Sequence, residues 1–269
     1  MGWGHMSVDE KKLPTLFVGH GSPMNAIQDN AFTQSLRNLG AQLQTPQAIL
    51  CVSAHWCTKG TWITHMQKPR TIHDFYGFPD PLYQIDYSAE GSLELAELIS
   101  HSIHTPTLGL DEGNWGLDHG AWSVLRHLYP LANIPVLQLS IDLSKPPEYH
   151  LDLGRKLAQF RTQGVLILGS GNLVHNLRKI DFSPAAKPLD WAVEFDEWVR
   201  QRLIDRDWDT LIHQATRTRA GQLSIPTLDH WYPLLYVLGA SEPEEALRFE
   251  YEGIDHGSIS MRSFSLGRS

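Results

Sequence analysis

Hydrophobic residues along the chain alternate between short continuous runs and longer stretches with helical spacing, a pattern typical of α/β proteins. Three short runs, at residues 16–18, 49–54 and 165–168, predict buried strands that lead directly into polar side chains. Further strands are predicted at residues 61–64, 134–141, 248–251 and 258–264, the last two as closing strands at a sheet edge. The hydrophobic pattern therefore predicts an α/β fold.

Helices are predicted where hydrophobic residues recur every three or four positions. The clearest case is residues 191–204, in which Phe195, Val199 and Leu203 form one line along a helix. Ser92 is a suitable N-cap for a helix that continues through Ile103. The other predicted helices span residues 31–43, 121–128, 148–161 and 228–238.

Two stretches lack regular patterning, and both contain residues with chemical potential. Residues 68–83 combine prolines with aromatic side chains, and residues 112–120 end in Leu117-Asp118-His119-Gly120. Irregular stretches of this length in a compact domain are usually binding loops or lids. Because no internal repeat, low-complexity tract or linker interrupts the chain, we predict one domain.

Composition narrows the possible partners and the cellular location. The net charge of −8 and the lack of a basic cluster argue against binding to nucleic acid or to an anionic membrane. No hydrophobic run approaches the roughly 20 residues that span a bilayer. Cys51 and Cys57 are the only cysteines, which fits a reducing compartment. Residues 1–5 resemble a cloning-derived leader before a natural start at Met6. We therefore expect a cytoplasmic domain spanning residues 6–269.

Three of the fourteen histidines come after the predicted strand runs. His20 lies between two glycines after the first run, an arrangement that favours function because glycine is costly unless the backbone must approach something closely. His55 follows the second run, and His175 follows the glycine-rich segment 169–172. Sites in open α/β sheets form beyond the carboxyl ends of strands. These positions predict an imidazole-rich metal site, in which His175 is either a ligand or a general base.

Two further histidines have an acidic neighbour in the sequence. Asp118 precedes His119, where a carboxylate could fix the tautomer of the ring, although a plain loop residue is an equal alternative. Asp229 precedes His230, and either side chain could face a metal. The cysteines do not have the spacing of a thiolate metal site, so both are expected to be small buried fillers.

Six segments, in order along the chain, carry a more specific signal. They are Gly19-His20-Gly21-Ser22-Pro23, Ser53-Ala54-His55-Trp56, Thr71-Ile72-His73-Asp74-Phe75 with Gly77-Phe78-Pro79, Gly116-Leu117-Asp118-His119-Gly120, Gln138-Leu139-Ser140-Ile141-Asp142, and Gly169-Ser170-Gly171-Asn172 with His175-Asn176-Leu177-Arg178. Together they resemble the class III extradiol ring-cleavage dioxygenases, and especially those of the 4,5-DOPA type. The resemblance extends from about residue 13 to about residue 264.

This resemblance implies a fold and a set of metal ligands. The fold would be a single domain with a central mixed sheet flanked by helices on both faces. His20, His55 and His230 would be metal ligands. His175 would be a fourth ligand or an acid/base beside the metal, and His119 would assist proton transfer.

The resemblance also implies a substrate and a cofactor. The substrates would be O2 and a catechol such as L-DOPA, opened to a muconate semialdehyde, with His73, Phe75 and Tyr76 in the loop that covers the ring. Fe(II) would be the working metal, and Zn(II) is plausible in purified protein because imidazole ligands suit both ions. Two alternatives stay open at this point: a zinc hydrolase with His175 or His119 as base, and a non-enzymatic metal- or ligand-binding protein. The oligomeric state is also open.

Overall fold

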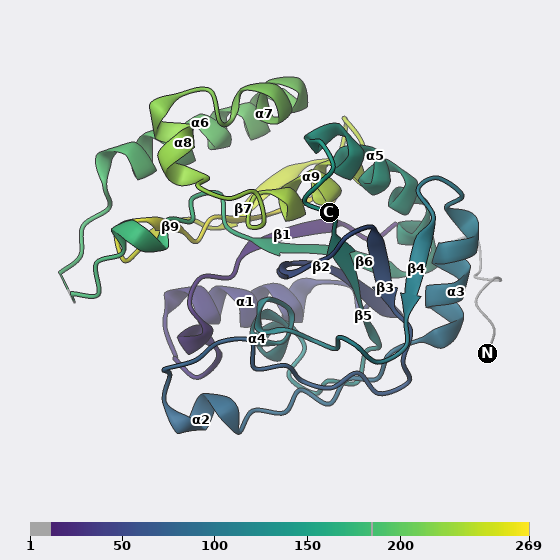
Figure 1. Cartoon of the computed structure of the whole chain (residues 1–269). Coiled ribbons are helices and arrows are strands. Elements are labelled where there is room, and N and C mark those ends of the chain that lie inside the picture. Colours follow the sequence, from purple (N-terminus) through teal and green to yellow (C-terminus); the bar gives the residue numbers. More distant parts are fainter. Residues whose placement is uncertain (1–11, 184, 269) are drawn as a thin grey trace.

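A mixed sheet of eight strands forms the centre of the computed structural model, which describes residues 12–183 and 185–268 (Figure 1). The strand order is β4-β3-β5-β2-β6-β1-β10-β7. The strands are β1 (Thr15–Gly19), β2 (Ala48–Cys57), β3 (Thr61–Thr64), β4 (Leu108–Asp111), β5 (Val136–Ile141), β6 (Val165–Gly171), β7 (Leu247–Tyr251) and β10 (Ser263–Leu266). Strands β5, β2, β6 and β1 run parallel, whereas β3 is antiparallel to β5, and β10 is antiparallel to β1 and β7. The predicted mixed sheet is confirmed.

Helices cover both faces of this sheet, as predicted (Figure 1). The helices are α1 (Ala31–Gln42), α2 (Asp80–Tyr83), α3 (Leu93–Ser102), α4 (His119–Leu128), α5 (Pro147–Leu157), α6 (Asp190–Asp205), α7 (Trp208–Gln214), α8 (Arg219–Ser224) and α9 (Tyr232–Gly239). Helices α1 and α4 bury Phe32, Leu36 and Trp122 against one face. Helices α3, α5 and α9 bury residues such as Leu95 and Leu234 against the other. No helix among the described residues is long and apolar enough to cross a membrane.

The predicted elements that matter for the site are present, with shifted ends. Helix α4 begins at His119, two residues earlier than predicted, because the Asp118 side chain accepts a hydrogen bond from the Ala121 backbone N–H and caps the helix. Helix α9 begins at Tyr232, four residues later than the predicted start, so His230 lies in the turn before it. The N-cap prediction for Ser92 is confirmed by its hydrogen bond from the Leu95 N–H.

Several predictions about short elements were wrong or missing. Strand β4 and helices α2, α7 and α8 were not predicted, since four to seven residues carry little periodic signal. Helix α2 lies at the end of residues 68–83, which were expected to be irregular throughout. The predicted strand 258–264 is divided into β9 (Ile259–Ser260), which pairs with β8 (Ile254–Asp255), and β10, which lies inside the sheet rather than at its edge. Cys51 is buried, but Cys57 is exposed at the end of β2, so the prediction of two buried cysteines was wrong for Cys57.

The buried side chain of His150 on α5 predicts how stability depends on pH. Its Nδ1 lies 2.9 Å from the Tyr236 hydroxyl, and burial lowers the pKa of His150 to about 4. Between pH 6.5 and pH 4 the unfolded chain therefore binds a proton that the folded chain does not, so the free energy of unfolding falls as the pH falls. We expect His150 to account for a loss of about 2 kcal/mol between pH 7 and pH 5.

Urea unfolding of the wild type and of His150→Gln at both pH values measures this contribution. The variant should lose less stability on acidification than the wild type, whatever its stability at pH 7. Equal losses in the two proteins would show that His150 is not the titrating group.

Candidate active site

The glycines around His20 allow the backbone to pass unusually close to a neighbouring segment. Strand β1 ends at Gly19, where an added Cβ would lie 2.8 Å from the Ser260 carbonyl oxygen and 2.8 Å from the Met261 carbonyl carbon. Gly21 has a φ of +63°, in the left-handed region that favours glycine. The close approach inferred from the sequence is therefore present, and it leaves His20 buried at the carboxyl end of β1.

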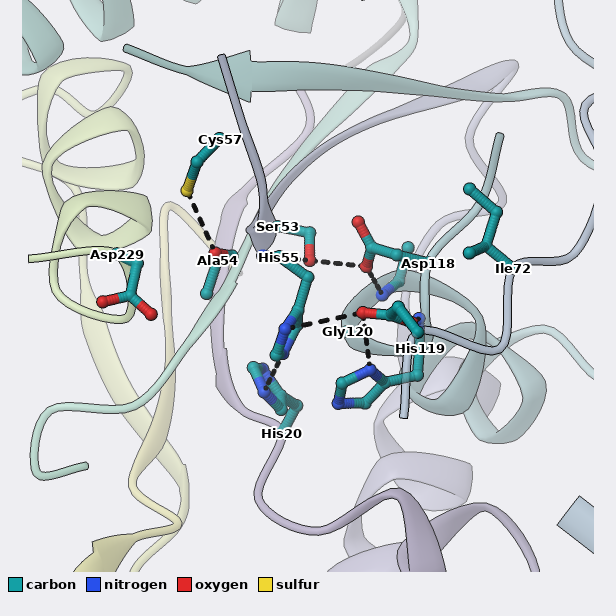
Figure 2. Close-up of polar contacts among 12 residues, drawn as sticks. His20, Ser53, Ala54, His55, Cys57, Ile72, Asp118, His119, Gly120 and Asp229 are labelled. Atoms are coloured by element: carbon teal, nitrogen blue, oxygen red, sulfur yellow. Dashed lines mark hydrogen bonds and ion pairs between the residues drawn. The ribbon is translucent and has the colours of Figure 1, made fainter. Parts of the chain in front are cut away.

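Three imidazoles meet beyond the ends of the parallel strands. His20 follows β1, His55 lies near the end of β2, and His230 comes from the turn before α9. One donor atom from each ring lies within 4.8 Å of the others, and the Nε2 atoms of His20 and His55 are 3.1 Å apart (Figure 2). Two nitrogens that each lie about 2.1 Å from one metal ion are roughly 3 Å apart, so this spacing fits shared coordination. The buried Nε2 of His230 has no hydrogen-bond partner among the described residues.

In two of these rings, a hydrogen bond at Nδ1 determines which nitrogen is free to bind a metal. The Ser170 hydroxyl donates to the Gly120 carbonyl at 2.6 Å, so its oxygen accepts from His20 Nδ1 at 3.0 Å. The carboxylate of Asp229 lies 2.7 Å from His230 Nδ1 and accepts a hydrogen bond from it. Both rings therefore keep the Nε2 lone pair free for a metal, because a hydrogen bond donated by Nδ1 fixes the tautomer of a metal-binding histidine.

A second carboxylate, that of Asp74, lies between His55 and His119. Its Oδ1 accepts the backbone N–H of His119 at 2.9 Å, and its Oδ2 lies 2.9 Å from His119 Nδ1 and 3.5 Å from His55 Nδ1. Although burial raises the pKa of the Asp74 carboxyl, contacts with His119 lower it below its usual value. His55, Asp74 and His119 form a second group of possible ligands. Because Asp74 faces Nδ1 atoms on both rings, it fits the role of a carboxylate that supports the two histidines better than the role of a metal ligand.

Asp118 does not contact the ring of His119, contrary to the expectation from their adjacency. Its Oδ1 accepts from the Ser53 hydroxyl at 2.6 Å (Figure 2). Its Oδ2 accepts from the Gln138 side-chain amide at 2.7 Å. Burial and the nearby Asp74 raise the pKa of the Asp118 carboxyl. Asp118 therefore caps α4 and joins β2 to β5, while Asp74 is the acidic partner of His119.

His175 lies beside the three facing imidazoles rather than among them. Its ring stacks on that of His230, with centroids 3.4 Å apart and an interplanar angle of 7°. Burial, followed by the charge of His230, lowers the pKa of His175 to about 2. Burial and neighbouring imidazoles also lower the pKa of His20 and of His55 well below 6.5. All three rings are therefore neutral at pH 7, the form that can bind a metal or accept a proton.

A cavity of about 650 Å³ opens from the imidazole cluster, large enough for a single-ring ligand. Its lining includes His20, His55, His119, His175 and His230, the apolar side chains Phe75, Phe78, Ile180, Phe182 and Ile259, and the polar residues Asn176, Arg178, Thr227, Asp255 and His256. Of the three substrate-binding residues expected in the aromatic loop, only Phe75 lines this cavity. His73 lies outside it, with Nε2 3.0 Å from the Ile85 carbonyl oxygen, and the side chain of Tyr76 is 92% exposed.

Comparison with known proteins shows to which family the chain belongs. Residues 14–259 match the model of the catalytic LigB subunit of aromatic ring-opening dioxygenase. The chain belongs to this family. Dioxygenases of the LigB family depend on a non-haem metal, and the cluster of His20, His55 and His230 is a possible site for it.

Relatives of this LigB-family chain carry a consistent name. It is 46% identical to the 4,5-DOPA dioxygenase extradiol of Escherichia coli K12, over 95% of each chain. It is 35% identical to the enzyme of the same name from Beta vulgaris, over 96% of this chain and 98% of the relative. A crystal structure of an uncharacterized Escherichia coli K12 protein has a TM-score of 0.82 and 42% identity, and the match covers 95% of this chain and 100% of that one. The protein is thus an extradiol dioxygenase, and neither the hydrolase nor the non-enzymatic alternative is favoured.

Sequence reasoning did not identify every residue that supports the LigB-type site. Asp74 and Ser170 lie within the segments that carried the resemblance, but neither had a role assigned. The signal for Ser170 was its place between Gly169 and Gly171, which puts it at the end of a strand beside His20. Asp74 had no periodic pattern around it. An isolated bridge between Thr71 and Leu117 brings its loop to the start of α4.

The close packing of Gly171 against the turn that carries His230 gives a testable expectation. A Cβ at Gly171 would lie 2.3 Å from the His230 carbonyl oxygen, so Gly171→Ala must displace that turn. We expect zinc binding to weaken at least about tenfold, as it does when the support of a ligand is disturbed. Gly253→Ala is the matched control, because its Cβ would meet no atom closer than 3.4 Å.

Zinc affinity from competition titration, together with thermal melting of both variants, tests this expectation. Unchanged zinc affinity in a folded Gly171→Ala protein would show that the position of His230 is not needed for metal binding.

Proposed function

We propose that this enzyme cleaves the ring of a catechol, such as L-DOPA, beside one hydroxyl group, with O2 as co-substrate and a muconate semialdehyde as product. The observation that carries the proposal is the cluster of facing imidazoles at the inner end of a cavity with aromatic walls. The names of the relatives support the choice of L-DOPA as the first substrate to test. We further propose that residues 6–269 act as one catalytic domain in the cytoplasm.

In this proposal His20, His55 and His230 hold the metal through one nitrogen each. The support is that their donor atoms lie within 4.8 Å and that Ser170 and Asp229 occupy Nδ1 on two of the rings. Fe(II) held by three imidazoles would supply redox chemistry and open positions for a catechol and O2. Zinc suits the same ligands but has no redox chemistry, so a zinc-loaded form would bind a catechol without opening it.

His119 is the proposed residue for proton transfer from the catechol. The carboxylate of Asp74 lies 2.9 Å from its Nδ1, which favours a proton at that nitrogen and leaves the other nitrogen as a base. The same carboxylate would stabilise the positive ring after the proton has moved. Phe75 supports the position of His119, because its ring meets that of His119 edge to face with centroids 5.5 Å apart.

We assign His175 to acid/base chemistry rather than to coordination. Its ring is absent from the groups of possible metal ligands found among residues 12–183 and 185–268. It lines the cavity and is neutral at pH 7, because burial and His230 lower its pKa. A neutral imidazole in this place can take a proton from the substrate or return one to the product.

Aerobic turnover of L-DOPA by metal-free protein reconstituted with Fe(II) tests the proposed reaction. A yellow semialdehyde product is expected with iron and none with zinc, because ring opening by O2 requires a redox-active metal. If L-DOPA and simple catechols gave no product with either metal, the proposed reaction would be wrong. Full activity after complete replacement of iron by zinc would contradict the choice of metal.

Two alanine variants separate metal binding from proton transfer. His20→Ala should lose both bound metal and turnover. His119→Ala should keep its metal but turn over about 100-fold more slowly or worse, the usual effect of losing a general base. Metal content by mass spectrometry and turnover with L-DOPA are measured for both. The roles would be reversed if His119→Ala lost metal while His20→Ala kept it.

A further inference from the structure

Two charged side chains in the lining of the cavity make no hydrogen bond or ion pair with the described residues. Arg178 is exposed, and within residues 12–183 and 185–268 its guanidinium makes no hydrogen bond or ion pair. Asp255 is half-buried, and its carboxylate likewise makes none with the described residues. By contrast, Asp74 and Asp229 in the same cavity each contact an imidazole. Only Arg178 and Asp255 are therefore left to bind a charged ligand among these four.

Strand pairing along one wall of the cavity shows how Asp255 is placed relative to the imidazole cluster. Asp255 pairs with Ile259 across β8 and β9, and Ile259 pairs with His175 in an isolated bridge. Residues directly opposite in antiparallel strands have side chains on the same face, with Cβ atoms about 5 Å apart. His175, Ile259 and Asp255 thus form one row that leads away from the imidazoles. All three residues line the cavity.

Arg178 lies on the same wall as this row. It follows His175 by three residues, in a 3-10 helix at Leu177–Lys179. Hydrogen bonds from the Asn176 N–H to the Ser258 carbonyl and from the Asp181 N–H to the His256 carbonyl hold this segment against the β8–β9 hairpin. A cation and an anion are therefore presented by neighbouring segments, away from the facing imidazoles.

We propose that Arg178 and Asp255 recognise the zwitterionic α-amino-acid group of the catechol substrate. Arg178 binds the carboxylate, for which a guanidinium offers paired donors, and Asp255 binds the ammonium. The catechol ring then lies toward His20 and His55. This inference rests on the proposed ring cleavage and adds to it the two residues that recognise the amino-acid group of the substrate.

The environment of Asp255 supports this assignment. Burial raises the pKa of the Asp255 carboxyl, and the neighbouring His256 offsets this only in part, so the charge of Asp255 is held at a cost in the free enzyme. A bound ammonium group would offset that cost. A ligand with a carboxylate alone would leave Asp255 uncompensated, and one with an ammonium alone would leave Arg178 unused.

Binding of three catechols to the zinc-loaded protein without O2 tests the inference apart from turnover. The ligands are L-DOPA, dopamine, which lacks the carboxylate, and 3,4-dihydroxyphenylpropionate, which lacks the ammonium. Arg178→Gln should raise the Kd for L-DOPA about tenfold, the effect of losing a hydrogen bond between charged groups, and leave that for dopamine nearly unchanged. Asp255→Asn should weaken L-DOPA similarly and leave 3,4-dihydroxyphenylpropionate nearly unchanged.

Lys179→Gln is the control, because Lys179 is exposed next to Arg178 and does not belong to the cavity lining. It removes the same charge and should not change the order of the three affinities. Equal weakening of all three ligands in Arg178→Gln, or no weakening of L-DOPA, would overturn the inference, as would a wild type that binds none of the three. We expect the wild type to bind L-DOPA more tightly than dopamine or 3,4-dihydroxyphenylpropionate. If it does so but its Fe(II) form does not open the ring, the proposed reaction fails and this inference stands.

Discussion

The site depends on hydrogen bonds that fix the tautomers of its imidazoles. Two neutral rings that face each other through Nε2, as His20 and His55 do at 3.1 Å, can share a metal only if both protons are on Nδ1. Ser170 supplies the acceptor for His20, and Asp74 lies at 3.5 Å from Nδ1 of His55. The carboxylate of Asp229 accepts a hydrogen bond from Nδ1 of His230 at 2.7 Å. Without these partners, a proton on Nε2 would occupy the position at which a metal must bind.

The parallel sheet places these partners where they are needed. Strands β1, β6 and β2 are adjacent and run in one direction, so His20, Ser170 and His55 emerge at the same edge. Glycine is required wherever the backbones that carry them meet, since a Cβ at Gly19 or Gly171 would overlap with another segment. The buried rings in turn have lowered pKa values, which keep them neutral and able to bind a metal at pH 7.

The parts of this arrangement that the sequence predicts are those with local signals. A hydrophobic run that leads into a histidine, directly at His55 and through Gly19 at His20, marks the end of a buried strand. His20 and His55 could therefore be placed at one edge of the sheet before their contacts were known. His230 had only its acidic neighbour and the family resemblance, because the turn before α9 has no periodic pattern. Asp74 depends on a long-range bridge between two irregular loops, which no local pattern encodes. For the same reason, adjacency suggested Asp118 as a possible partner of His119, whereas the carboxylate that contacts this ring is that of Asp74.

Charge changes along the cavity in a way that bears on which ligands can enter. At the inner end the carboxylates of Asp74 and Asp229 contact imidazoles, whereas the side chains of Arg178 and Asp255 make no hydrogen bond or ion pair in the described chain. The protein as a whole carries a net charge of −8, which repels anions at long range. At physiological ionic strength this repulsion is screened beyond about 8 Å, so a cation that lines the cavity can outweigh it for a carboxylate that arrives there. A zwitterion has no net charge for the long-range field to repel, and it gains from both local groups once inside. The combination of an acidic surface with one unpaired cation in the cavity therefore favours an amino-acid catechol over a purely anionic one.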